Sequence, residues 1–192
     1  MLLDMLIRLR NNPQSIFIYG GEKMKTNTKQ LVTNSALLAI GFILHYVTPA
    51  MGSMQIDFSL ITLILIVTLN KNNLGSCVAS GLATGIFSGI TSKFAMGLVP
   101  NIIDKIMTTI VVYLLIRLLD RTALNSKIKA VITNSVGTLV SGIVFLASAL
   151  LLVGLPAPFF VLFATVVIPA IVVNTIAGFL VSNICEKYRE VK

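Results

Sequence analysis

The chain has 192 residues, of which 56% are hydrophobic and 11% are charged, and its formal net charge is +8. Soluble domains carry about 45–50% apolar and about 25% charged residues. These proportions exclude a soluble enzyme, a disordered chain and a nucleic-acid-binding domain. The apolar runs approach the length of about 20 residues that a spanning helix needs, which predicts an all-α, polytopic membrane protein.

Residues 1–23 differ in character from the rest, because their short apolar runs are interrupted by charges and by Pro13. They lack the apolar core and cleavage site of a signal peptide. They form either an amphipathic helix at the membrane interface or an extension from a mis-assigned start. The second alternative rests on the codons for Gly20–Lys23, which can contain a ribosome-binding site before Met24. We expect one six-helix transmembrane domain over residues 24–192.

Six apolar runs predict six transmembrane helices. They cover residues 31–48, 56–69, 74–91, 99–119, 129–153 and 159–184. The second run is short for a spanning helix. Pro169 is expected to kink the last helix, because proline removes a backbone donor.

The fifteen Lys and Arg residues are distributed unevenly over the predicted ends of these helices. Thirteen fall on one side, and only Lys93 and Lys105 fall on the other. The positive-inside rule then places both termini in the cytoplasm, in agreement with an even number of spans. The positive charge therefore indicates topology and requires no nucleic-acid partner.

Small residues recur every four positions on two of the predicted helices. Gly81 and Gly85 belong to such a stripe, and Ser35 and Ala39 form a second one. Stripes of this kind allow close approach of another helix, since lipid provides no hydrophobic drive for association. The stripes are either packing surfaces inside the bundle or docking surfaces for a second membrane protein, and their periodicity does not separate the two.

The segment after the third predicted helix carries most of the polar residues that are candidates for a binding site. Asn101, Asp104 and Lys105 have the spacing i, i+3 and i+4, so they share one helix face, and Lys93 and Phe94 precede them. Ionisable residues within a membrane are costly and are functional candidates by default. Asp104 and Lys105 either neutralise each other or provide a zwitterion site, with an ammonium for a carboxylate and a carboxylate for an amine.

Other polar residues at membrane depth are weaker candidates. Asp57 is either a second group for an amine or an exposed acid at a helix end. His45 is more often a packed residue than a proton carrier. We expect Asn134 and Asn174 to connect helices by hydrogen bonds rather than to bind substrate.

No motif for catalysis or for a cofactor is present in the sequence. There is no Walker A motif, no HExxH or other metal-ligand pattern, and no nucleophile–base set. Cys77 and Cys185 form no CxxC pair. We therefore expect neither an enzyme nor a resident metal or cofactor.

The segment Gly89–Lys105, with its Pro-Asn and Asp-Lys pairs, resembles the bacterial tryptophan transporter family, as does the stretch from Ser141 through Pro156. The resemblance extends from Met24 to the C-terminus. That family is in turn similar to the substrate-binding (S) components of energy-coupling factor transporters. Those are six-helix proteins that work with a transmembrane coupling protein and a pair of ATPases.

The resemblance implies roles for particular residues. Ser35 and Ala39 would face the coupling protein, with Ser35 standing where the family pattern has alanine. From the charges of the residues themselves, we expect Lys105 to bind the substrate carboxylate and Asp104 or Asn101 to bind the amine. Phe94 and the loop 49–55 would close over the indole ring.

The sequence therefore predicts a multi-pass protein of the bacterial plasma membrane, surrounded by lipid, that takes up tryptophan or a similar small molecule. It predicts substrate-binding residues and, separately, residues that couple to a partner. The first set is Lys105, Asp104, Asn101, Phe94, Lys93 and Asp57, and the second is Ser35, Ala39, Gly81 and Gly85. Two alternatives stay open, namely a standalone ion-coupled carrier and an S component for a vitamin-like substrate.

Overall fold

The computed structural model describes residues 28–51 and 54–190, so the expectation for residues 1–23 lies outside the described part. The packing below concerns the unit Val32–Lys192. The helices are α2 (Thr28–Val47), α3 (Ser59–Leu69), α4 (Leu74–Thr91), α5 (Leu98–Asp120), α6 (Ser126–Leu152), α7 (Phe159–Leu162) and α8 (Ile168–Glu190), with a π-helical turn, η2 (Phe163–Val167), between the last two. Two-residue strands β1 (Ala50–Met51) and β2 (Met54–Gln55) pair antiparallel between α2 and α3.

The predicted all-α class is confirmed, and each apolar run coincides with a helical segment. The last helix ends at Glu190 rather than at residue 184, and α3 begins three residues late, at Ser59 rather than at residue 56. The side chain of Asp57 accepts a hydrogen bond from the backbone N–H of Ser59 at 2.9 Å. This turn occupies the residues that the hydropathy pattern assigns to the helix.

Four of the described helical segments are long and apolar enough to cross a membrane. They are α2, α4, α6 and the segment Phe159–Asn183. Helix α3 has 11 residues, too few for about 30 Å of hydrocarbon at 1.5 Å per residue. Helix α5 has 23 residues and buries Asp104 and Lys105. Six crossings and cytoplasmic termini remain predictions.

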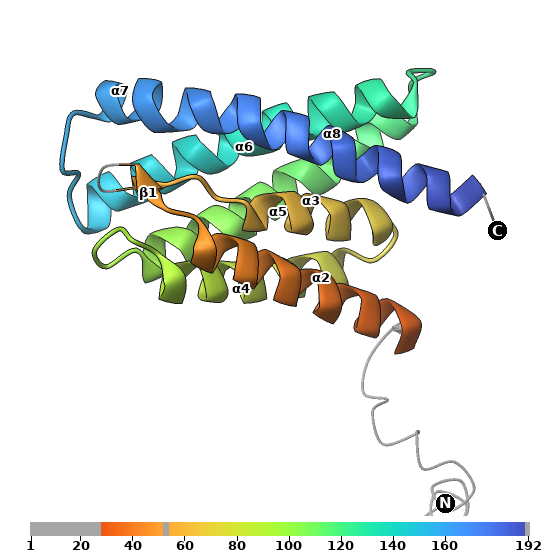
Figure 1. Ribbon diagram of the computed structural model, residues 1–192, viewed down its shortest axis with the longest axis horizontal. Coiled ribbons are helices and arrows are strands. Elements are labelled where there is room, and N and C mark those ends of the chain that lie inside the picture. Colours follow the sequence, from red (N-terminus) through yellow and green to blue (C-terminus); the bar gives the residue numbers. More distant parts are fainter. Residues whose placement is uncertain (1–27, 52–53, 191–192) are drawn as a thin grey trace, which may run out of the picture. The chain divides into compact units, whose positions relative to one another are not determined.

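Within the unit Val32–Lys192, successive loops alternate between two ends of the bundle (Figure 1). The β1–β2 hairpin, the loop 92–97 and the loop 153–158 lie at one end, on the left of the figure. The α3–α4 and α5–α6 connections lie at the other end. The helices therefore run up and down in sequence order, as consecutive spans do.

Helix α3 lies at the centre of this unit and is buried on nearly all sides. Its buried residues are Ser59, Leu60, Ile61, Thr62, Leu63, Ile64, Ile66 and Val67. A helix that is apolar all around is stable only where other helices cover it. The sequence of α3 therefore accounts for its central place.

Helices α4 and α5 pack closely through the glycine stripe of α4. A Cβ added at Gly85 would lie 2.8 Å from the Cα of Ile102, and one at Gly81 would lie 2.3 Å from the Oγ1 of Thr109. The absence of side chains at these positions lets the two backbones approach. The stripe thus packs inside the bundle.

We expected Pro169 to kink the last helix. The irregularity that the structure has there is a π-helical turn just before Pro169, whose nitrogen carries no hydrogen. The N–H of Ile168 donates to the carbonyl of Phe163, five residues earlier, which defines the π-helical turn η2. Such turns are frequent at functional sites. Here the turn contributes Val166 and Val167 to the pocket described below.

Candidate binding site

A pocket of about 80 Å³ lies among the helices, near the end that carries the hairpin and the loop 92–97. Side chains from α2, β2, α3, α5, α6, η2 and α8 line it, together with residues of the loops before α3 and before α5. Its lining includes Asp57, Asp104 and Lys105. Segments that are far apart in the sequence therefore bring three charged groups into one pocket.

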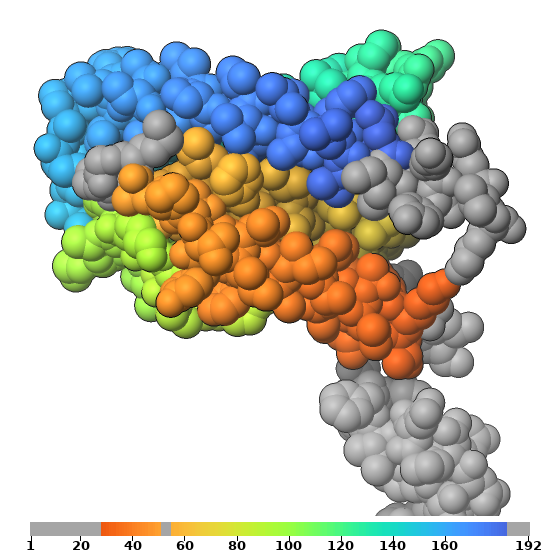
Figure 2. Space-filling model, viewed as in Figure 1, coloured from red at the N-terminus to blue at the C-terminus, as the bar shows by residue number. Residues whose placement is uncertain are grey.

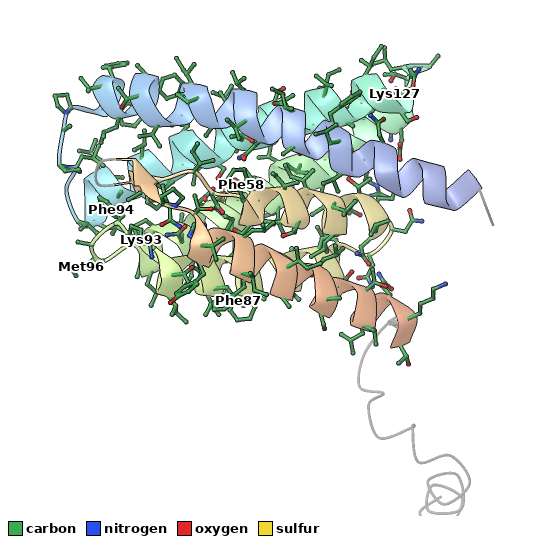
Figure 3. The ribbon with its side chains drawn as sticks, viewed as in Figure 1. Phe58, Phe87, Lys93, Phe94, Met96 and Lys127 are labelled. Carbon is green, nitrogen blue, oxygen red and sulfur yellow. The ribbon has the colours of Figure 1, made fainter. Side chains whose placement is uncertain are left out.

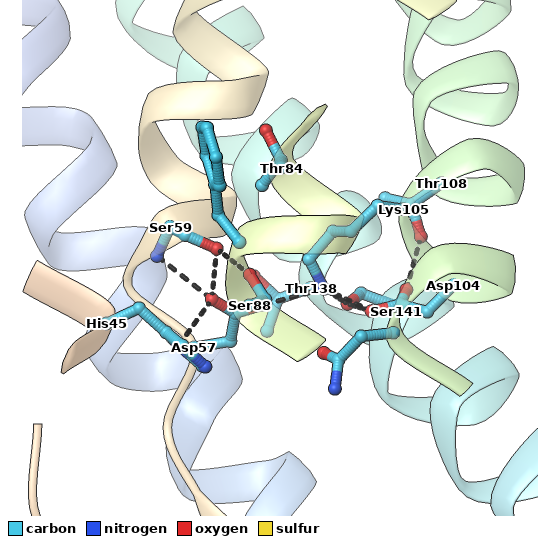
Figure 4. Close-up of polar contacts among 12 residues, drawn as sticks. His45, Asp57, Ser59, Thr84, Ser88, Asp104, Lys105, Thr108, Thr138 and Ser141 are labelled. Carbon is cyan, nitrogen blue, oxygen red and sulfur yellow. Dashed lines mark hydrogen bonds and ion pairs between the residues drawn. The ribbon is translucent and has the colours of Figure 1, made fainter. Parts of the chain in front are cut away.

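Lys105 is the centre of the polar network (Figure 4). Its side chain is 1% exposed. The ammonium contacts the carboxylates of Asp57, at 2.6 Å, and of Asp104, and it lies 3.4 Å from the Oγ of Ser141. An ammonium has three donors and no acceptor. These three partners therefore use its full hydrogen-bonding capacity.

Asp104 is held from several sides and anchors Lys105. Thr108 donates to its Oδ1 at 2.9 Å, and Ser141 donates to its Oδ2 at 2.9 Å. With Lys105 as the third donor, the carboxylate is well satisfied at 1% exposure. A buried charge is tolerated only with such partners.

Asp57 is the more open carboxylate, with 18% of its side chain exposed. Its Oδ1 lies 3.1 Å from the Nδ1 of His45 and accepts a hydrogen bond from Ser59. The hydroxyl of Ser59 also contacts that of Ser88 at 2.7 Å. Asp57 thus connects α2, α3 and α4 to the lysine on α5.

The other side of the pocket is apolar. Phe94 is 8% exposed, and its ring packs edge-on against Phe145 with centroids 5.7 Å apart. Leu146 of α6 and Val166 and Val167 of η2 complete this wall. Aromatic rings favour edge-to-face and offset contacts at such distances, so the wall suits an aromatic ligand.

Most of the predicted binding residues come together, and one does not. Asn101, Asp104, Lys105, Phe94 and Asp57 line the pocket, but Lys93 does not. Lys93 is exposed, and its ammonium lies 5.4 Å from the ring centroid of Tyr46 (Figure 3). It makes a cation–π contact outside the pocket.

The predicted coupling residues lie in two different environments. Ser35 and Ala39 are exposed on α2, which runs along the surface in Figure 2. Gly81 and Gly85 are buried against α5. Of the two alternatives for the small-residue stripes, packing inside the bundle fits the buried positions of these glycines.

Sequence reasoning missed or undervalued several lining residues: Ser141, Thr138, Gln55, His45 and Asn174. Hydroxyl and amide side chains are common between membrane helices as simple packing contacts. Their type and spacing therefore did not distinguish these lining residues from ordinary packing residues. Only their position around Asp57 and Lys105 in the folded chain does so.

Known proteins resemble the chain over most of its length. The sequence model of the family described as "Tryptophan transporter TrpP" matches residues 27–189. A probable tryptophan transport protein of Clostridium acetobutylicum is 43% identical over 159 residues, 82% of this chain and 92% of that protein. One of Clostridium perfringens is 42% identical over 172 residues, 85% of this chain and 94% of that protein.

A shorter match is to a probable tryptophan transport protein of Bacillus subtilis, 53% identical over 57 residues, which cover 30% of this chain and 33% of that protein. No solved structure matches the chain. The family and these relatives are named as transporters rather than enzymes, and the apolar helices are those of a membrane protein. With a pocket that joins paired charges to an aromatic wall, the chain belongs to the tryptophan transporter family.

Proposed function

We propose that the chain binds tryptophan and carries it across the bacterial plasma membrane as the S component of an energy-coupling factor transporter. The main observation for an aromatic amino acid as substrate is the position of Lys105, which lies between two carboxylates beside the aromatic wall. Relatives that match over more than nine-tenths of their length are named as probable tryptophan transport proteins, which supports tryptophan in particular.

A free amino acid complements the charges of the pocket. Its ammonium and carboxylate are attached to the same carbon, and the contact between Asp57 and Lys105 is the one that can open to admit both. The ligand carboxylate then replaces Asp57 at the ammonium of Lys105, while Asp104 keeps its own contacts. Each buried charge keeps an opposite partner throughout, which avoids the cost of an unpaired charge.

The pocket must widen to hold an indole ring. An apolar cavity that binds benzene measures about 150 Å³, and this pocket measures about 80 Å³. Phe94 belongs to the loop before α5, at the end of the bundle that carries the β1–β2 hairpin. Movement of this loop and of Phe145 provides the space and leaves both rings to pack against the indole.

The role as an S component rests on the sequence and on α2. The sequence contains no Walker A motif, so ATP-driven transport requires ATPase subunits and a transmembrane coupling protein. Helix α2 has only Asn34, Gly41 and His45 buried. Its exposed Ser35 and Ala39 lie on a surface that a coupling protein can cover closely.

The test separates binding from transport. Because the chain contains no tryptophan, a change in the fluorescence of added tryptophan reports its binding to purified protein without tryptophan fluorescence from the protein itself. We expect saturable binding, and no accumulation by proteoliposomes that hold this chain alone under a proton or sodium gradient. Absence of binding contradicts the substrate. Gradient-driven accumulation by the chain alone contradicts the S-component role and identifies a secondary carrier.

A further inference from the structure

Two buried carbonyl oxygens in the pocket have no hydrogen-bond partner among the described residues. They are the Oδ1 of Asn174 and the Oε1 of Gln55. Buried polar atoms are nearly always paired, and an unpaired one costs about 1–3 kcal/mol. Two such acceptors in one pocket indicate a donor that comes from a ligand.

The neighbours of Asn174 fix the direction of its amide. Its Nδ2 lies 3.3 Å from the backbone carbonyl of Asp57 and 3.5 Å from the Oγ1 of Thr138. A backbone carbonyl only accepts, so the nitrogen must face it. The Oδ1 of this side chain, which is 1% exposed, therefore points away from that carbonyl and stays unpaired.

Gln55 is fixed in the same way, through two contacts with His45. Its Nε2 donates to the backbone carbonyl of His45 at 3.0 Å and lies 2.8 Å from the ring Nε2. The other ring nitrogen, Nδ1, lies 3.1 Å from the Oδ1 of Asp57. The Oε1 of Gln55 therefore points away from the carbonyl of His45 and stays without a partner among the described residues.

The charges of the pocket are then unequal. Its lining has two carboxylates, Asp57 and Asp104, and one ammonium, Lys105, besides the imidazole of His45. One negative charge is in excess. The unpaired oxygens belong to Gln55 and Asn174, each of which contacts either Asp57 or its neighbour His45. An excess negative charge among acceptors favours a cationic donor.

We propose that Asp57, Gln55 and Asn174 form the binding site for the ammonium group of the substrate. This assignment rests on the proposed function. The three N–H donors of an alkylammonium match the three side-chain acceptors. Asp104, one of the groups expected from the sequence to hold the amine, already accepts from Lys105, Ser141 and Thr108. The amide nitrogen of Asn101 donates to the carbonyl of Gly97. Asp57 also has partners, namely Lys105, His45 and Ser59, but its side chain is 18% exposed against 1% for Asp104, so Asp57 is the carboxylate that a new cation can reach.

The test compares three indole ligands by their fluorescence with purified protein. Tryptophan has both charged groups, tryptamine has only the ammonium, and 3-indolepropionate has only the carboxylate. We expect Asn174→Ala to weaken tryptophan and tryptamine by about 10-fold or more, the range for a hydrogen bond to a charged group. The affinity for 3-indolepropionate, which is weak in the wild type, stays unchanged.

Two further variants make the result specific. Asn134→Ala is the matched control, because Asn134 is also buried with an unpaired Oδ1 but does not line the pocket. It leaves the affinity for all three ligands unchanged. Gln55→Met removes the second acceptor from the hairpin, outside the helices, and we expect the same selective loss as for Asn174→Ala.

The outcomes separate this assignment from the proposed function. If both acceptor variants bind tryptophan as the wild type does, the ammonium lies elsewhere and the assignment is wrong. An equal loss for tryptophan and 3-indolepropionate overturns it too, because the oxygens then do not act on the ammonium. Wild-type protein that binds none of the ligands refutes the proposed function, and the assignment with it.

Discussion

Two lysines among the described residues form ion pairs with aspartate, and the pairs differ mainly in burial. Lys105 is 1% exposed between Asp104 and Asp57, whereas Lys71 and Asp120 are 45% and 39% exposed at a distance of 2.6 Å. Exposed ion pairs contribute about 0–1 kcal/mol. Removing one partner of a buried pair costs about 3–5 kcal/mol, because the remaining charge loses its partner. The two lysines therefore differ in their importance for stability.

We predict that Lys105→Met lowers the free energy of unfolding by about 3–5 kcal/mol and that Lys71→Met changes it by less than about 1 kcal/mol. The measurement is thermal or denaturant unfolding of both variants in the same detergent. Replacing both charges, as in Lys105→Met with Asp104→Asn, should restore part of the loss. Equal destabilisation by the two single variants would contradict the burial of Lys105.

At the residue scale, the sequence predicted the charged residues of the candidate site but not the polar residues that surround them. Asp104 and Lys105 stand out because ionisable residues are rare in apolar helices. Lys93 is the same kind of residue near the same end, yet it lies outside the pocket over Tyr46. Serine, threonine and amide residues carry no such signal. Ser141, 36 residues from Lys105 in the sequence, reaches it only through the packing of α6 on α5.

At the scale of elements, hydropathy predicted where the helices lie, but not which helix packs against which. The apolar runs set where each helix lies, and local groups such as Asp57 and Pro169 adjust the ends and the turns. Small-residue stripes were ambiguous, since close packing inside a bundle and docking of a partner need the same side chains. In the structure Gly85 is covered by α5, which is packing inside the bundle. Ala39 is exposed on α2, and docking of a partner there stays a prediction.

The exposed stripe of α2 makes a prediction that separates binding from transport. Ala39→Phe adds a bulky side chain to the surface proposed for the coupling protein and leaves the pocket unchanged. We expect tryptophan binding by the purified variant to stay as in the wild type, and uptake by cells with the complete transporter to fall several-fold, because close helix contact depends on small residues. Ala79→Phe, at an exposed alanine of α4, should keep both. Normal uptake by cells with the Ala39→Phe variant would show that the coupling protein does not bind this surface.

At the scale of the whole molecule, the loops and the basic residues divide in the same way. The loops of residues 32–190 alternate between two ends of the bundle (Figure 1). Lys93 lies at the end that carries few basic residues, and Lys127 lies at the opposite end (Figure 3). The assignment of charges to two sides assumes that successive helices alternate, and the backbone has that alternation within the described residues. The orientation itself stays a prediction of the positive-inside rule.

Cysteine labelling in intact cells tests this orientation. In a background with Cys77 and Cys185 replaced by alanine, Met96→Cys places a thiol on a residue that is 78% exposed in the loop 92–97, and Ala123→Cys places one in the exposed α5–α6 connection. We predict that a membrane-impermeant maleimide modifies the first thiol from outside and the second only after permeabilisation, because basic loops stay in the cytoplasm. The opposite labelling pattern would mean that the protein has the reverse orientation in the membrane. Labelling of both thiols from outside would mean that α5 does not cross the membrane. Outside access at residue 96 would also place Phe94, which lines the pocket two residues away, near the outer side, where an uptake protein must first meet its substrate.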